Sequence, residues 1–216
     1  MREQVIKAIE EGKVIAIVRG INEEQAVSVA QAVFKGGVKC IEVTFNQKNP
    51  ETFCNTVNAI KAIKKNCPEM CVGAGTVLTK EQVDLAKSAG AEYIVSPDTD
   101  EEVIKYTVKS GLVSLPGAYT PSEVKRAHFA GADFVKLFPC TSGGVAYLKA
   151  VKAPLSQVKY LAVGGVNENN AKDFIDAGAV GVGIGGNLVN KKWIDAGEYD
   201  KITEVARTLV ESISEV

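Results

Sequence analysis

Eight short apolar runs alternate with longer amphipathic stretches along this chain, and that alternation restricts its fold more than any other feature. The runs are rich in the β-branched and aromatic residues that favour strands. Their first residues lie 19 to 32 positions apart, which leaves room for a helix after each one. The predicted strands are Val14–Arg19, Lys39–Phe45, Cys71–Val77, Tyr93–Pro97, Leu112–Gly117, Phe134–Pro139, Tyr160–Val166 and Val180–Gly185.

The intervening segments carry the start and stop signals of helices. Amphipathic patterns predict helices at Glu23–Lys35 and Glu81–Ser88, and a short helix at Glu3–Glu11 precedes the first strand. Four residues that can accept a hydrogen bond from a first-turn N–H stand at predicted helix starts: Asn22, Thr79, Thr99 and Thr120. Glycines, which tolerate the left-handed conformation at a helix C-terminus, precede five of the strands: Gly37, Gly90, Gly111, Gly131 and Gly178.

Eight strands alternating with helices predict an α/β fold of the (β/α)8 or TIM-barrel type, with a short helix before the first strand. An open, doubly wound sheet is the alternative architecture, and the count of eight with roughly even spacing favours the closed barrel. No glycine-, serine- or proline-rich linker and no block of like charge divides the chain. We therefore expect residues 1–216 to form one domain.

Composition excludes several classes of partner. The 216 residues carry a formal net charge of -1, so we expect no electrostatic affinity for nucleic acid or anionic membranes. No apolar run approaches the roughly 20 residues that span a bilayer, and the charged N-terminus does not resemble a signal peptide, which predicts a cytoplasmic protein. Five cysteines without a CxxC pair indicate free thiols. His128 is the single histidine and no Cys or carboxylate cluster replaces it, so we expect no metal site. We also expect no cofactor.

A lysine stands in the middle of the sixth predicted strand, which is otherwise apolar. Lys136 shares its face of the strand with Phe134 and Phe138. Burial among aromatic rings disfavours the charged form of an amine and lowers its pKa, and the neutral amine is the nucleophile in Schiff-base chemistry. The plain alternative is a lysine that snorkels at a strand edge, but a closed barrel has no free edge.

A glutamate occupies the corresponding place in the second predicted strand. Glu42 shares one face with Cys40 and Thr44. A carboxylate inside a barrel needs a partner or a raised pKa, and either would suit a general acid or base beside a lysine. A structural ion pair, with Lys136 as the partner, explains the same position equally well.

Other residues at the predicted strand ends suit anion binding. Arg19 ends the first strand on the same face as Ile17. A guanidinium there could bind a carboxylate or a phosphate, or could simply be solvated. Gly73 and Gly75, followed by Thr76, leave space for a ligand to approach the backbone, although they could equally mark bends.

Glycines also follow the last two predicted strands. Gly164 and Gly165 end the seventh strand, and Gly185 and Gly186 with Asn187 end the eighth. Phosphate sites of these barrels are frequently built in these two loops from backbone N–H groups. The two glycine pairs together therefore indicate a phosphate ligand.

These residues lie in motifs that resemble those of the 2-keto-3-deoxy-6-phosphogluconate (KDPG) aldolase / 4-hydroxy-2-oxoglutarate (KHG) aldolase family. The resemblance extends from about Val14 to the C-terminal helix, and its motifs have the order and spacing of the family. They are GGVKCIEVTF around Glu42, VGAGTVLT at Val72–Thr79, IVSP at Ile94–Pro97, LPGAYTPSE at Leu115–Glu123, VKLFP around Lys136, VGGV at Val163–Val166 and GIGGNLV at Gly183–Val189.

The resemblance implies a role for each matching position. Lys136 corresponds to the Schiff-base lysine and Glu42 to the acid/base glutamate, whereas Thr76 corresponds to a residue that binds the pyruvate carboxylate. Pro97 and Phe138 correspond to apolar walls of the pocket. The positions that fall at the substrate phosphate site are Gly164, Gly165, Gly186 and Asn187. Members of the family are commonly homotrimers and need no metal.

The chain departs from the family pattern at several positions. Asn46 stands where many members have an arginine that grips the substrate carboxylate, whereas others carry that arginine after the first strand, as Arg19 does here. Ala162 and Val163 replace a Pro-Thr pair, as in relatives acting on the galactonate-derived epimer, and Asn187 replaces a more usual serine. The changes leave the amine chemistry intact but bear on the configuration of the sugar.

The resemblance and the residues together predict a class I aldolase, a carbon–carbon lyase, that binds a small 2-keto acid. It would cleave KDPG to pyruvate and glyceraldehyde 3-phosphate, or KHG to pyruvate and glyoxylate, through a Schiff base on Lys136. An aldolase for 2-keto-3-deoxy-6-phosphogalactonate is the nearest alternative. A phosphosugar isomerase or epimerase with Glu42 as base, and a barrel that only senses a phosphorylated acid, are the other two. Metal-dependent aldol chemistry is disfavoured by the single histidine.

Overall fold

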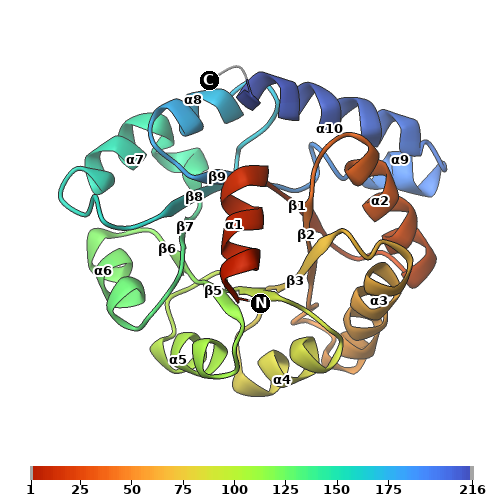
Figure 1. The fold of residues 1–216 in the computed structure, drawn as a ribbon, viewed down its shortest axis with the longest axis horizontal. Helices are drawn as coiled ribbons and strands as arrows, with labels where there is room; N and C mark the ends of the chain where they lie inside the picture. The colour runs from red at the N-terminus through yellow and green to blue at the C-terminus, as the bar shows by residue number, and fades with distance from the viewer. Residues whose placement is uncertain (1, 215–216) are drawn as a thin grey trace.

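The computed structural model describes residues 2–214, which form one sheet of nine parallel strands surrounded by helices (Figure 1). The strands are β1 Val14–Val18, β2 Cys40–Thr44, β3 Cys71–Gly75, β4 Tyr93–Val95, β5 Val113–Leu115, β6 Gly117–Ala118, β7 Val135–Leu137, β8 Tyr160–Val163 and β9 Gly181–Ile184. The α-helices are α1 Arg2–Gly12, α2 Glu23–Lys35, α3 Phe53–Asn66, α4 Lys80–Ser88, α5 Glu101–Lys109, α6 Pro121–Phe129, α7 Gly144–Lys152, α8 Ala171–Asp176, α9 Lys191–Asp195 and α10 Tyr199–Ser214. Two short 3₁₀ helices lie at Pro50–Thr52 and Cys140–Ser142.

The strand order confirms the predicted barrel and contradicts the doubly wound alternative. The order is β5-β4-β3-β2-β1-β9-β8-β7-β6, so consecutive strands are neighbours except for β5 and β6, and the first strand pairs with the last. A doubly wound sheet would instead reverse its strand order at a switch point. The nine strands form a nearly closed barrel, and α1 is an additional helix ahead of β1 as expected.

The fifth predicted strand is in fact two strands, which is why the structure has nine. Pro116 separates β5 from β6, because a proline lacks the N–H that a continuous ladder would use. Its carbonyl nevertheless accepts a hydrogen bond from the Lys136 N–H (2.9 Å). The chain therefore changes its pairing from β4 to β7 at this point, and the same residue that interrupts the strand helps to close the barrel beside Lys136.

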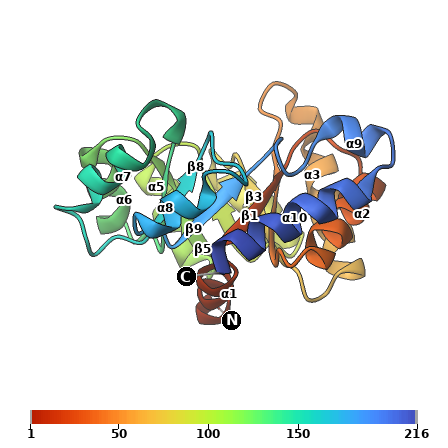
Figure 2. The same cartoon turned by 90° about the horizontal axis from the view of Figure 1, so that it is seen from above.

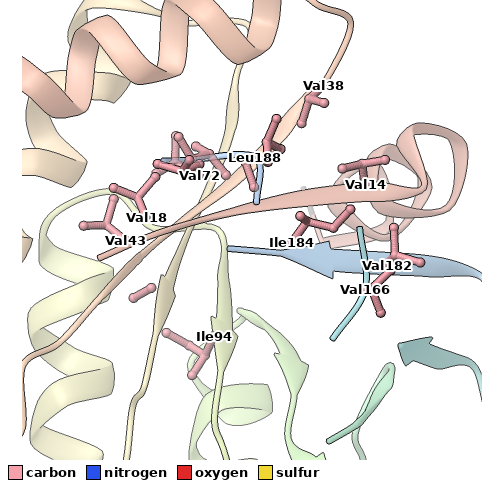
Figure 3. Packing of buried hydrophobic residues seen from close by; sticks show 14 of the residues in the cluster. Val14, Val18, Val38, Val43, Val72, Ile94, Val166, Val182, Ile184 and Leu188 are labelled. Atoms are coloured by element: carbon pink, nitrogen blue, oxygen red, sulfur yellow. The ribbon is translucent and has the colours of Figure 1, made fainter. Parts of the chain in front are cut away.

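Alternating residues of each strand pack on opposite faces. In β1, Val14, Ala16 and Val18 join the large apolar cluster between the sheet and the helices (Figure 3), whereas Ile15 joins a smaller cluster inside the barrel. The smaller cluster also includes Tyr93 and Phe134, both fully buried, and Val5 and Ile9 of α1.

Helix α1 therefore covers the end of the barrel at which the strands begin. It crosses the middle of the ring in Figure 1 and projects from one side in Figure 2, which shows it away from the surrounding helices. The side chains that it buries fill the interior below the level of Glu42. A ligand consequently has to enter from the opposite end, where the strands finish.

The helix boundaries follow the predicted signals with one correction. The side chains of Asn22, Thr79 and Thr120 cap α2, α4 and α6 as expected. Helix α5 is instead capped by Asp100, whose carboxylate accepts hydrogen bonds from two first-turn N–H groups, while the Thr99 hydroxyl donates to the Gly117 carbonyl (2.6 Å). All five predicted glycines have φ between 81° and 101°, the left-handed conformation expected after a helix: Gly37, Gly90, Gly111, Gly131 and Gly178. Among the helices of residues 2–214, none has the length and apolarity needed to cross a membrane.

Gly73 provides a direct test of interior packing. A Cβ at this position would overlap the ring of Tyr93 on the neighbouring strand. We expect Gly73→Ala to lower the free energy of unfolding by roughly 1–3 kcal/mol, the usual cost of overpacking. The measurement is urea unfolding. In the matched control, Gly12→Ala, the new methyl meets its nearest atoms at 3.9 Å, so a change of only about 0.5 kcal/mol or less is expected. Equal effects of the two substitutions would contradict this account of the interior.

Candidate active site

A cavity of about 610 Å³ lies at the ends of the strands away from α1, the end at which barrel enzymes carry their sites. All ten residues that were predicted from the sequence to form the catalytic and substrate-binding site line this cavity. They are Arg19, Glu42, Thr76, Pro97, Lys136, Phe138, Gly164, Gly165, Gly186 and Asn187. They come from seven of the strands, so the barrel brings together residues that are up to 168 positions apart in the chain.

Lys136 and Glu42 occupy the floor of this cavity. Lys136 on β7 is 8% exposed and Glu42 on β2 is 3% exposed. The Lys136 Nζ lies 4.6 Å from the centre of the Phe138 ring. Within residues 2–214 neither group forms an ion pair within 4 Å, so the structural ion pair considered from the sequence is not present. Both groups are therefore free to act on a ligand that enters between them.

Burial controls the protonation of both groups. It lowers the pKa of Lys136 from the usual lysine value, with Glu42 opposing the change and Arg19 adding to it. It also raises the pKa of Glu42 from the usual carboxyl value, and the positive charges of Lys136 and Arg19 oppose this change. The environment thus favours a neutral amine next to a carboxyl group that can exchange protons, the combination required for nucleophilic addition to a carbonyl.

Arg19 lies at the rim of the same cavity. It follows β1 on the face that also carries Ile17, and both side chains line the wall above Glu42. Asn46, which stands where many family members have an arginine, lines two neighbouring pockets and is absent from the lining of this one. The geometry therefore favours Arg19 over Asn46 as the group that could meet a ligand's carboxylate.

Thr76 is held in an unusual backbone conformation. Its φ of 55° falls in the left-handed region, which costs a non-glycine residue on the order of 1–3 kcal/mol and persists only where the surroundings hold it. Its carbonyl accepts a hydrogen bond from Gln47 Nε2 (2.6 Å), and its side chain borders the cavity. Such strain is concentrated at functional sites, where it places a group for binding.

The glycines after β8 leave no room for a side chain. Gly164 and Gly165 have φ of 90° and 78°. A Cβ on Gly164 would lie 3.2 Å from the Phe138 ring, and one on Gly165 would overlap Thr141. Both conformation and space therefore require glycine here, and the exposed backbone can approach a ligand closely.

Sequence reasoning missed one cation of the cavity. Lys191, in the first turn of α9, lines the wall together with Gly186 and Asn187 and pairs with Asp195 (2.6 Å). Its position four residues after the predicted phosphate loop was the available signal. The apolar lining that was also missed consists of Ile17, Val163, Val166 and Val189, with Gly183 beside them, whereas Gly185 belongs to the glycine pair that was predicted. Across residues 2–214, no three His, Cys, Asp or Glu side chains gather as they would around a metal ion.

Fold and cavity together define a (β/α)8-barrel protein with a buried lysine and glutamate at the ends of its strands. The family model for KDPG and KHG aldolase matches residues 5–205. A KHG/KDPG aldolase of Escherichia coli strain K12 is 38% identical over 202 residues, covering 93% of this chain and 92% of the relative. A 2-dehydro-3-deoxy-6-phosphogalactonate aldolase of the same strain is 38% identical over 175 residues, covering 81% and 83%.

A solved structure of the family has the same fold. KDPG aldolase from Legionella pneumophila, with pyruvate captured at low pH as a covalent carbinolamine intermediate, superposes with a TM-score of 0.85 at 28% identity. The alignment covers 95% of this chain and 98% of that one. This chain belongs to the KDPG/KHG aldolase family and is thus a carbon–carbon lyase of the aldolase type, as the motifs indicated.

The charges around Lys136 predict opposite pH shifts for two substitutions. The rate of imine formation should rise with pH as Lys136 loses its proton. The negative charge of Glu42 raises the pKa of Lys136, so Glu42→Gln should move this rise to lower pH. The positive charge of Arg19 lowers that pKa, so Arg19→Met should move the rise to higher pH. The measurement is the pH profile of irreversible labelling by subsaturating pyruvate and cyanoborohydride. Profiles that shift in the same direction, or not at all, would contradict the coupling.

Proposed function

We propose that this protein is a class I aldolase that releases pyruvate and an aldehyde from a phosphorylated 2-keto-3-deoxy sugar acid, from 4-hydroxy-2-oxoglutarate, or from both. The observation that carries the proposal is a buried lysine beside a buried glutamate, without an ion pair between them, on the floor of a cavity. No cofactor is needed, because the protonated imine itself accepts the electrons of the breaking bond.

The first half of the reaction forms the imine. Neutral Lys136 Nζ adds to the C2 carbonyl carbon, and the proton that the nitrogen loses passes to the carbonyl oxygen, which gives a neutral carbinolamine. Glu42 gives the proton with which that oxygen leaves as water, and the protonated imine remains. A positioned acid or base of this kind typically contributes roughly 10²–10⁴-fold. The raised pKa of Glu42 suits it to carry the proton in both directions.

The second half breaks the carbon–carbon bond. The Glu42 carboxylate removes the proton of the C4 hydroxyl, directly or through a water, and the C4 oxygen forms the aldehyde carbonyl. The electrons of the C3–C4 bond move toward the imine nitrogen and leave an enamine of pyruvate. The enamine takes a proton at C3, and water hydrolyses the imine to release pyruvate and restore the amine of Lys136.

The substrate's two ends meet opposite walls of the cavity in this proposal. Arg19 and Thr76 bind the carboxylate and so hold the C2 carbon over Lys136. Pro97 and Phe138 form apolar walls beside the reacting carbons. The substrate phosphate lies against the backbone of the two glycine loops, at Gly164, Gly165, Gly186 and Asn187. Lys191 lies beside these loops and supplies a positive charge.

Two assays with one variant test the proposal. Pyruvate and cyanoborohydride should add one reduced pyruvate to the wild-type protein, located at Lys136 by peptide mass spectrometry, and none to Lys136→Met. A coupled dehydrogenase assay should detect pyruvate released from KDPG, from its galactonate epimer or from KHG, and comparison of the three identifies the preferred substrate. An isomerase, an epimerase or a sensor would give neither an adduct nor pyruvate.

Lys191 should discriminate between phosphorylated and unphosphorylated substrates. Lys191→Met should raise KM for the phosphorylated six-carbon acid by roughly threefold to tenfold, since a partly exposed charge contact contributes on the order of 1 kcal/mol. KM for 4-hydroxy-2-oxoglutarate should change much less. The measurement is steady-state kinetics of pyruvate release.

Two neighbouring substitutions serve as controls for Lys191. Lys192→Met removes a charge from the next residue, which does not line the cavity, and should leave both KM values unchanged. Asp195→Asn breaks the ion pair but keeps Lys191. If Lys191 acted only by stabilising α9 through that pair, Asp195→Asn would raise KM as much as Lys191→Met, which would contradict phosphate binding.

We further propose that the chain acts as a cytoplasmic homotrimer in carbohydrate breakdown of the Entner–Doudoroff type. The family resemblance supports this assembly, and so does Phe129 at the end of α6, which is 75% exposed and would be covered by association. Sedimentation equilibrium tests the assembly and should return three times the mass of the chain, 22.9 kDa.

A further inference from the structure

Two glutamines that the proposed mechanism does not use form a hydrogen-bonded chain next to Thr76. Gln47 follows β2, and Gln82 lies in the first turn of α4. Gln47 Nε2 donates to the Thr76 carbonyl (2.6 Å), and Gln82 Nε2 donates to Gln47 Oε1 (3.0 Å). Gln82 Oε1 in turn accepts from the Leu78 N–H (2.6 Å). This series of hydrogen bonds starts at Thr76 and ends at Leu78 in the same loop. Between them it passes through the side chains of Gln47 and Gln82.

The direction of every bond in this chain is fixed by its ends. A backbone N–H can only donate, so Gln82 has to present its oxygen to Leu78 and its NH₂ to Gln47. Gln47 therefore accepts through its oxygen and has only its NH₂ left for the Thr76 carbonyl, which can only accept. Gln82 is 3% exposed, where an unmade hydrogen bond is costly. The loop and the two side chains thus have one consistent arrangement.

Further bonds hold the rest of the loop. The Val77 N–H donates to the Val95 carbonyl (3.2 Å), and the hydroxyl of buried Ser96 donates to the Val77 carbonyl (2.7 Å). From the Thr76 carbonyl to the Leu78 N–H, every backbone polar group is therefore bonded. Within the described chain, the N–H and the hydroxyl of Thr76 itself have no hydrogen-bond partner. These two donors remain available to a ligand in the cavity that Thr76 lines.

We propose that Gln47 and Gln82 are positioning residues that hold Thr76 in its left-handed conformation, so that its free donors meet the carboxylate of the keto acid. The inference rests on the proposed function, because it concerns binding of the same substrate. Neither glutamine lines the cavity around Lys136, and both act through Thr76. Their effect therefore falls on the binding of the carboxylate and not on the chemistry at the amine.

The test compares pyruvate labelling in isosteric variants. Gln47→Met keeps the length of the side chain but can neither donate to Thr76 nor accept from Gln82. It should raise the pyruvate concentration that gives half-maximal labelling by cyanoborohydride, by roughly threefold to tenfold, the usual net effect of losing one hydrogen bond. The labelling rate at saturating pyruvate should not change. Gln47→Asn, which is one methylene too short to reach Thr76, is the milder variant should Gln47→Met fold poorly.

The matched control is Asn49→Ala in the same loop, an exposed residue whose side chain makes no cap bond. It should leave the half-saturating concentration and the melting temperature unchanged. A purely structural role of Gln47 predicts a lower melting temperature with unaltered half-saturation, and this result would overturn the inference.

A second background shows whether Gln47 acts through Thr76. In Thr76→Ala, which lacks the hydroxyl, the further change Gln47→Met should raise the half-saturating concentration by a smaller factor than in the wild type. The same factor in both backgrounds would show that Gln47 acts independently of Thr76 and would overturn the inference. Failure of this inference can be told apart from failure of the proposed function. If the proposed function were wrong, the wild-type protein itself would not be labelled by pyruvate.

Discussion

An amine and a carboxyl group are buried in one cavity without forming an ion pair, and the rest of the site depends on this arrangement. Charged groups leave water at a large cost unless they are paired, so burial acts on Lys136 and Glu42 by favouring their neutral forms. Had the two groups met directly, the pair would be a structural element of the interior. Because they remain apart, each keeps its capacity to react with a molecule that enters the cavity.

The barrel produces this arrangement by several independent features. Helix α1 and the aromatic residues of the interior fill the space below the two groups, and the strand ends leave open space above them. The break at Pro116 changes the pairing from β4 to β7 and gives the Lys136 backbone its own partner. Hydrogen bonds to Thr76 and the crowded glycines after β8 fix the rim. The residues around a ligand are thus in place before it binds, which lowers the entropic cost of orienting it.

The sequence alone predicted most of this structure, because the relevant signals are local. The alternation of apolar runs specified the barrel, the glycines marked the helix ends, and the parity of Lys136 and Glu42 within their strands placed both in the interior. Arg19 could be placed at the cavity for the same reason. The glycine pairs and Thr76 were likewise found from their places at the strand ends, and the family resemblance supplied their expected roles.

Features that depend on contacts between distant segments could not be predicted. The division of the fifth strand at Pro116 depends on its bond to β7, and Asp100 replaces Thr99 as a helix cap because Thr99 is engaged by Gly117. Lys191 reaches the cavity through the path of the chain after β9, and the glutamine chain beside Thr76 joins three elements that no local pattern connects. The absence of an ion pair between Lys136 and Glu42 is likewise a matter of three-dimensional distance, for which strand parity carries no information.

The most direct test of the central claim is the pKa of the Lys136 amine in the ligand-free protein. It can be followed by heteronuclear NMR of protein labelled at lysine, with the Lys136 signal assigned by its loss in Lys136→Arg. The account predicts titration below the ordinary lysine value of 10.5, as expected for an amine whose charged form is disfavoured by burial. Titration at or above that value would show a solvated or ion-paired ammonium and would contradict the account.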